Sequence, residues 1–137
     1  MPAAPTIPAP ALLGVVGLGG AVGSLGRYAV GLALPHGAAG FPWATFGVNV
    51  TGSLAMGVLV AWVLSMLDPH PWLRPFLGVG VLGGWTTFSS FALDVHALSG
   101  AGHPGLALTY VISSFAVGLV AVGAGLGLGQ RAFGDRA

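Results

Sequence analysis

The fold is decided by an apolar stretch from Phe76 to Leu98, FLGVGVLGGWTTFSSFALDVHAL. Its length is close to the roughly 20 residues that a membrane-spanning helix needs. Two adjacent glycines and four hydroxyl side chains interrupt it between Gly83 and Ser90. Inside a membrane, backbone freed by such a break is tolerated only where protein or a water-filled cavity satisfies it, and it commonly builds ion sites. The stretch therefore predicts a transmembrane helix that is broken mid-membrane.

The rest of the chain has the same apolar character. Of the 137 residues, 55% are hydrophobic and only 5% are charged, whereas about 25% are charged in ordinary soluble domains. The connections between the apolar stretches are too short for another domain, and the prolines in residues 1–10 predict a flexible tail. We expect an all-α integral membrane protein with a single four-helix domain, residues 1–137. The four transmembrane helices are expected at residues 11–34, 43–67, 76–98 and 105–128.

Composition also excludes several functions. The chain has four Lys and Arg against three Asp and Glu, a net charge of +1, so it lacks the basic patch that binds nucleic acid. Without cysteine it has no disulfide, thiolate metal site or thiol nucleophile. The sequence contains no nucleophile-elbow, P-loop or HExxH motif, and its four histidines are scattered over loops and helix ends. We therefore predict that the protein is not an enzyme.

The arginines give a weak orientation signal. With four spans, both termini and the second connection lie on one side, which holds Arg74, Arg131 and Arg136. The positive-inside rule then favours cytoplasmic termini. Arg27 lies near the opposite end of the first span and reduces the bias to three against one. This distribution is compatible with one orientation or with insertion both ways.

Small residues spaced four apart predict close helix packing. In membranes such pairs let two helix backbones approach each other. Alone, each pair is also typical of any tight helical bundle. The pairs are Gly19 with Gly23, Ser53 with Gly57, and Gly123 with Gly127.

Two charged residues, Arg27 and Asp94, and one amide, Asn49, lie inside the predicted spans. Charged groups at membrane depth are costly and usually face a cavity or a partner, which makes Arg27 a functional candidate unless it snorkels to the interface. Asp94, near the end of its span, either snorkels or lines a vestibule. Asn49 and Ser53 lie one helical turn apart. The Asn49 amide either donates a hydrogen bond to an anion or pairs with a neighbouring helix.

Aromatic and hydroxyl side chains suggest two further polar features. Phe88 and Phe91 are three residues apart on one helix face, and the positive edge of an aromatic ring can stabilise a small anion. Packing against lipid or core is the other reading of this pair. Tyr110 and Ser114 lie four apart and make a polar stripe that either guides an ion or joins helices.

Three segments together resemble the small microbial fluoride channel family called Fluc or CrcB. They are GAVGSLGRY at 20–28, TFGVNVTGS at 45–53 and GGWTTFSSF at 83–91. The similarity covers essentially all four spans. The third segment is the most selective of the three.

This resemblance implies a passive fluoride-selective channel in the plasma membrane that exports fluoride from the cytoplasm and confers fluoride resistance. It implies a dual-topology antiparallel homodimer, or a pair with an oppositely oriented paralogue, with two parallel pores through the lipid bilayer. In each pore, the ring edges of Phe88 and Phe91 contact fluoride and Asn49 is a hydrogen-bond donor. Tyr110 and Ser114 belong to a polar track.

The same resemblance implies a structural sodium ion at the dimer centre. The backbone carbonyls of Gly83 and Thr86 from both subunits would hold it. Arg27 would supply positive potential at a pore vestibule, where Asp94 stands in the place of the glutamate that is usual in the family. One turn beyond Ser114, where the family often has a hydroxyl residue, this chain has Gly118.

Two other functions compete with the channel. A non-conducting scaffold subunit of a membrane complex explains the glycines and the apolar spans but leaves Arg27, Asn49 and the broken segment without a task. A small multidrug-type exporter fits the size. It should place an acidic residue deep in its first helix, where this chain has Arg27.

Overall fold

The chain folds into four long apolar helical segments in the computed structural model, which describes residues 8–67 and 69–134. Within that part of the chain there is no β-strand. This confirms the prediction of an all-α protein with four helices able to span a membrane, and hence of a multi-pass membrane protein. The segments are α1 (Ala9–Ala33), α2 (Trp43–Leu64), a third built from η1 (Arg74–Leu82), α3 (Gly83–Trp85) and α4 (Phe88–Gly100), and α5 (Pro104–Phe133).

The helix ends differ from the predicted ones by a few residues. Helix α1 begins at Ala9, inside the predicted tail; residues 1–7 of that tail and Arg136 lie outside the described residues. Helix α5 continues to Phe133, past the predicted end at residue 128. Proline stands in the first turn of α1, η1 and α5, where its missing N–H costs no hydrogen bond.

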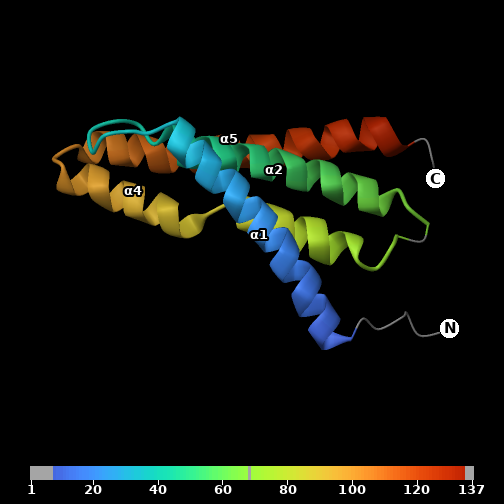
Figure 1. Ribbon diagram of the computed structural model, residues 1–137. Coiled ribbons are helices and arrows are strands. Elements are labelled where there is room, and N and C mark those ends of the chain that lie inside the picture. The colour runs from blue at the N-terminus through green and yellow to red at the C-terminus, as the bar shows by residue number, and fades with distance from the viewer. Residues whose placement is uncertain (1–7, 68, 135–137) are drawn as a thin grey trace.

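Figure 1 shows how the helices are arranged. Helices α2 and α5 lie side by side and run in the same direction, and α4 lies beside the first part of α5. Helix α1 crosses obliquely over η1 and α3. The beginning of α1 and the end of α5 lie at the same end of the bundle. Consecutive segments therefore alternate in direction, as a chain that crosses a membrane four times requires.

Helix α1 packs against η1 and α3 backbone to backbone. A methyl group added at Gly19 would lie 2.5 Å from the Phe76 carbonyl oxygen, and one added at Gly23 would overlap the Val81 carbonyl oxygen. On the facing segment, a methyl group at Gly84 would lie 3.0 Å from the Cα of Gly20. The predicted contact at Gly19 and Gly23 is thus confirmed.

Glycines also join α2 to α5, but not all of those predicted. A methyl group at Gly57 would overlap the Val122 carbonyl oxygen, as the small-residue pattern predicts. Gly123 and Gly127 do not pack within this chain, since a methyl group at either would meet nothing within 4 Å. Gly125 and Gly129 face α2 instead, against Leu54 and Ala61 respectively. Helix α5 carries glycines on several faces, and only its rotation against α2 decides which of them pack.

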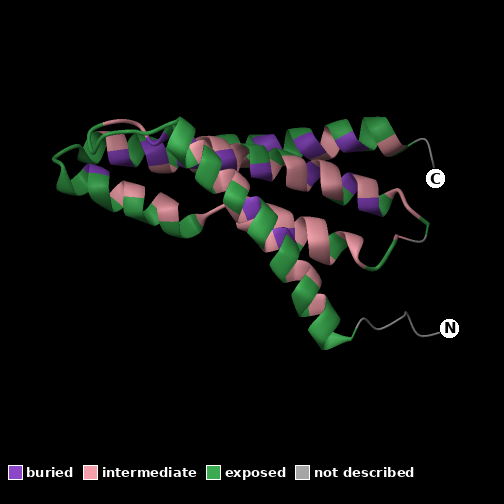
Figure 2. Cartoon of the chain, viewed as in Figure 1, coloured by how far each residue is buried: buried purple, intermediate pink, exposed green. Residues whose placement is uncertain are grey.

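Little of the chain is buried, and the buried residues lie on inward helix faces (Figure 2). A buried hydrophobic cluster joins Leu98, Ala107 and the fully buried Tyr110. Large aliphatic side chains point outward instead, with Leu13 74% and Leu119 75% exposed. A water-soluble protein rarely leaves so much apolar surface uncovered. Lipid or another apolar partner must cover these faces.

Candidate functional site

The third segment leaves the helical conformation at Thr86 and Thr87. Thr86 has φ −79° and ψ 158°, and Thr87 has φ −152° and ψ 124°, both extended. The Asn49 amide on α2 holds this stretch with two hydrogen bonds: its Nδ2 donates to the Thr87 carbonyl at 3.0 Å, and its Oδ1 accepts from the Thr87 N–H at 2.8 Å. The side chain of Asn49 thus replaces partners that a continuous helix would have supplied.

Thr87 also starts the helix that follows. Its Oγ1 accepts a hydrogen bond from the Ser90 N–H at 3.1 Å and lies 3.2 Å from the Ser90 hydroxyl oxygen. Threonine is a favourable N-cap because its side chain satisfies one of the N–H groups that a helix leaves unpaired at its start, a contribution of about 1 kcal/mol. Helix α4 consequently begins at Phe88, which sets where the Phe88 ring lies.

The two carbonyls predicted to hold sodium have lost their helical donors. In a continuous helix, the Gly83 carbonyl would accept from the Thr87 N–H and the Thr86 carbonyl from the Ser90 N–H. Both N–H groups donate elsewhere, to Asn49 Oδ1 and to Thr87 Oγ1. No group of three His, Cys, Asp or Glu residues that could hold a metal exists in the described ranges. Unwound carbonyls such as these are the oxygen ligands that sodium takes in membrane proteins.

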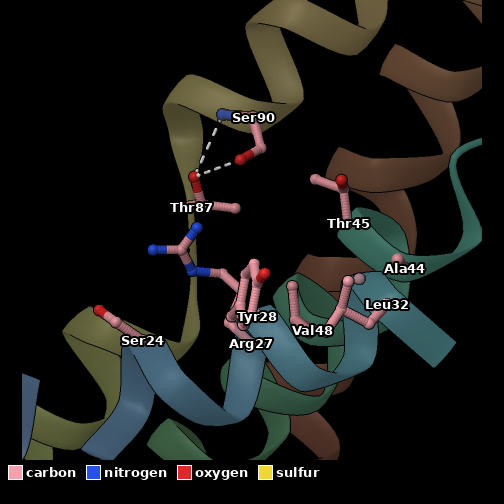
Figure 3. Close-up of a pocket in the computed structure, with 10 residues that line it drawn as sticks. Ser24, Arg27, Tyr28, Leu32, Ala44, Thr45, Val48, Thr87 and Ser90 are labelled. Carbon is pink, nitrogen blue, oxygen red and sulfur yellow. Dashed lines mark hydrogen bonds between the residues drawn. The ribbon is translucent and has the colours of Figure 1, made fainter. Parts of the chain in front are cut away.

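Arg27 is directed at the interruption and not away from it. Its Nε donates to the Gly84 carbonyl at 3.0 Å, and the Ser24 hydroxyl donates to the same oxygen at 3.5 Å. The last carbonyls of a helix carry partial negative charge and favour a nearby cation. The Gly84 carbonyl is one of them, because α3 ends at Trp85. In Figure 3 the guanidinium points toward Thr87, within a pocket of about 480 Å³ that Tyr28 also lines.

A larger hollow of about 780 Å³ lies between α2, α5 and the third segment, and we call it the groove. Six of the predicted site residues line it together: Asn49, Gly83, Thr86, Phe88, Phe91 and Ser114. Ser53, Phe115 and Gly118 line it as well. Residues from three separate spans therefore converge on one surface beside the interruption.

The two phenylalanines of the groove are held differently. Their ring centroids lie 5.8 Å apart with planes inclined by 38°. Phe91 is half-buried between Tyr110, at 5.2 Å, and Phe115, at 5.9 Å and nearly perpendicular. Phe88 is 75% exposed. Phe91 thus belongs to a packed aromatic cluster, whereas Phe88 projects from the start of α4.

Tyr110 and Ser114 separate in the structure. The Tyr110 ring is fully buried behind Phe91, and its hydroxyl donates to Asp94 Oδ2 at 3.3 Å. The other Asp94 oxygen lies 3.6 Å from His36 Nε2. Ser114 lines the groove, and its buried hydroxyl has no hydrogen-bond partner among the described residues. Tyr110 therefore packs against Phe91 from behind, whereas Ser114 is one of the residues that line the groove.

Sequence reasoning missed three contributors. The Thr87 backbone is the partner of Asn49, although the hydroxyl-rich pattern marks the stretch where it lies. Phe115 stands edge-on to Phe91, and His36 reaches Asp94 from the connection between α1 and α2. A local sequence pattern does not predict these contacts, because each one joins residues from two elements that are separate in the sequence.

The chain is similar to known proteins over most of its length. The family model described as CrcB-like protein, Camphor Resistance (CrcB), matches residues 14–126. The protein named Fluoride-specific ion channel FluC of Rhodospirillum centenum is 51% identical over 115 residues, which cover 82% of this chain and 90% of the relative. Its namesake in Agrobacterium fabrum is 45% identical over 126 residues, which cover 88% and 98%.

A longer relative is matched only in part. Fluoride-specific ion channel FluC 2 of Streptomyces avermitilis is 46% identical over 103 residues, and the match covers 75% of this chain and 65% of that relative. The family match itself includes the interruption and reaches into all four helical segments. The chain belongs to the CrcB-like protein family.

Proposed function

We propose that the protein is a passive fluoride-selective ion channel that exports fluoride from the cytoplasm across the plasma membrane and so confers fluoride resistance. The observation that carries this proposal is the groove, where Asn49, Phe88, Phe91 and Ser114 converge from three spans. The relatives named as fluoride-specific ion channels support the choice of ion. The protein is a pore and not an enzyme.

The groove offers what a small, strongly hydrated anion needs. A narrow pore must replace the water around the ion with other donors while it keeps binding weak enough for release. An asparagine amide carries two N–H donors, and only one of those of Asn49 is bonded to Thr87. The Ser114 hydroxyl has no protein partner among the described residues. The positive edges of Phe88 and Phe91 add stabilisation without a full countercharge.

Passive flow is sufficient for export. An inside-negative potential drives an anion outward with about 2.3 kcal/mol per 100 mV. Arg27, in the pocket near Thr87, supplies positive potential at the vestibule of the pore. Asp94 lies at the other charged position of the vestibule, and its contacts with Tyr110 and His36 moderate its repulsion of fluoride.

The working unit of the proposal is an antiparallel, dual-topology homodimer with two pores. Phe88 and Phe115 are 75% and 64% exposed, so the groove of one chain is open and a second copy would close it. The interruption at Thr86 and Thr87 would lie mid-membrane. The carbonyls of Gly83 and Thr86 from both copies, which lack their helical donors, would hold a structural sodium ion at the dimer centre. An oppositely oriented paralogue is the alternative partner.

Ion flux from liposomes tests the function. The purified protein is reconstituted, potassium efflux is enabled with valinomycin, and the release of fluoride and of chloride is followed with ion-selective electrodes. We expect fast loss of fluoride and negligible loss of chloride. Folded, dimeric protein that releases no fluoride would overturn the homodimeric channel and leave a paralogue-dependent channel, a scaffold or a small multidrug-type exporter.

Sodium dependence tests the proposed ion at the dimer centre. We expect the purified dimer to unfold at a lower temperature when N-methyl-D-glucamine replaces sodium at equal ionic strength. An unchanged unfolding temperature and an unchanged dimer fraction would contradict the sodium site without affecting the channel proposal.

A further inference from the structure

The Trp85 side chain lies between two helices, directly before the interruption. Trp85 is the last residue of α3, and the extended Thr86 follows it. A methyl group added at Gly26 of α1 would lie 2.9 Å from Cζ3 of the indole. One added at Gly52 of α2 would lie 3.2 Å from Cδ1 of the indole. At both positions, the absence of a side chain leaves the room that the indole occupies.

A hydrogen bond fixes the rotation of the indole. Its Nε1–H donates to the Thr51 hydroxyl oxygen of α2 at 2.9 Å. The Thr51 hydroxyl donates its own proton to the Gly47 carbonyl at 2.7 Å, so its oxygen is directed to the indole as an acceptor. Inside a membrane an indole N–H without such a partner is costly, because lipid offers no acceptor. Thr51 therefore ties Trp85 to α2 specifically.

Trp85 lies at the centre of the contacts that hold the interruption. On α1, Arg27 donates to the Gly84 carbonyl, one residue before Trp85. On α2, Asn49 pairs with the peptide of Thr87, two residues after Trp85. Helices α1 and α2 touch each other little. Their separation at this level is therefore set by what lies between them, and the indole is the large side chain in that place.

We propose that Trp85 is a positioning residue of the channel, which acts through its hydrogen bond to Thr51. The indole holds α1 and α2 apart at a fixed spacing, so that Arg27 and Asn49 both reach the interrupted backbone. It thereby fixes where α4 and the ring of Phe88 begin. Trp85 itself lies outside the groove. This inference rests on the proposed channel function and assigns a task to a residue that does not contact the ion.

Removal of the acceptor is the first test. Thr51→Val keeps the shape of the side chain and loses the hydroxyl. The readout is the unitary fluoride current of single channels in planar bilayers, which does not depend on how many channels fold or insert. We expect it to fall about fivefold, as the loss of one hydrogen bond that fixes the conducting geometry predicts. Thr51→Ser returns the hydroxyl and should restore most of the current.

The matched control is Thr109→Val. The Thr109 hydroxyl makes the same kind of back-bond, to the Gly105 carbonyl at 3.0 Å, on an exposed part of α5. This variant should conduct like the wild type. A wild-type unitary current in Thr51→Val, even with fewer active channels, would show a purely structural contact and overturn the inference. An equally low current in Thr51→Ser would overturn it as well.

Removal of the donor completes the test. Trp85→Phe keeps an aromatic ring and loses the N–H, and we expect the same current as in Thr51→Val. The double variant should conduct no less than either single one, because all three lack the same bond. Trp62→Phe, the same change outside the groove on α2, should conduct normally. Losses that multiply in the double variant would overturn the inference and leave the channel intact, whereas a wild-type protein without fluoride current would overturn the proposed function itself.

Discussion

The two halves of the third segment pack in opposite ways. Before the interruption, η1 and α3 touch α1 through glycines, with Gly80 and Gly84 pressed against its backbone. After it, α4 touches α5 through large side chains, including Phe91 and Leu98. The backbone contact leaves no room for an added methyl group, whereas at the side-chain contact a large side chain can be replaced by a smaller one. We infer that the first half fixes the position of the interruption and the second half carries the chemistry.

The largest expected effect comes from filling the backbone contact. Gly84→Ala would place a methyl group 3.0 Å from the Cα of Gly20 and from the nitrogen of Ser24. Since the contacted atoms are backbone, α1 must shift away, and we expect a loss of about 1 to 3 kcal/mol or more of stability. The measurement is thermal unfolding in detergent. Gly17→Ala is the control, because its methyl group would meet nothing within 4 Å; equal losses would contradict the contrast between the halves.

The second effect separates conduction from folding in α4. Phe88 is 75% exposed, so Phe88→Ile should leave the unfolding temperature almost unchanged while it removes a ring edge from the groove. We expect fluoride flux to fall to the rate of protein-free liposomes. Leu93→Ile, at a 67% exposed position of the same helix outside the groove, should conduct normally. Full flux through Phe88→Ile would remove this ring from the permeation pathway.

A change at the interruption should lower both the stability of the protein and its fluoride flux. Asn49→Asp keeps the oxygen that accepts from the Thr87 N–H but loses the N–H that donates to the Thr87 carbonyl. It also adds negative charge where an anion passes. We expect a loss of about 1 kcal/mol of stability and a larger, at least tenfold, loss of flux from charge repulsion. Gln130→Glu makes the same chemical change at an exposed position and should alter neither quantity; wild-type flux in Asn49→Asp would exclude Asn49 as a donor.

The smallest effect concerns the support behind Phe91. Tyr110→Phe keeps the buried ring and removes the hydroxyl that donates to Asp94. We expect a loss of about 0.5 to 1.5 kcal/mol in thermal unfolding and flux within about twofold of the wild type, because the ring still packs on Phe91. Tyr28→Phe, at a 66% exposed position, should leave stability unchanged. A complete loss of flux in Tyr110→Phe would place that hydroxyl in the permeation pathway.

The sequence by itself determined the class of the protein and the position of the interruption. Apolar stretches of membrane-spanning length predict helices because a lipid environment forces the backbone to pair within each segment. The glycine pair and the hydroxyl run at 83–90 predict irregular backbone, and Thr86 and Thr87 are extended. These signals depend only on residues that are neighbours in the chain, so they can be recognised in a single sequence.

Only the tertiary structure decided which residues meet. Asn49 could pair with an anion or with a helix, and the structure places the Thr87 peptide against it. Glycine spacing predicted Gly123 and Gly127, yet Gly125 and Gly129 face α2. Gly118 lies beside Ser53 only because α2 and α5 pack in one register. A helix sequence fixes which residues share a face, but the rotation of that face toward its neighbours follows from the packing of the whole bundle.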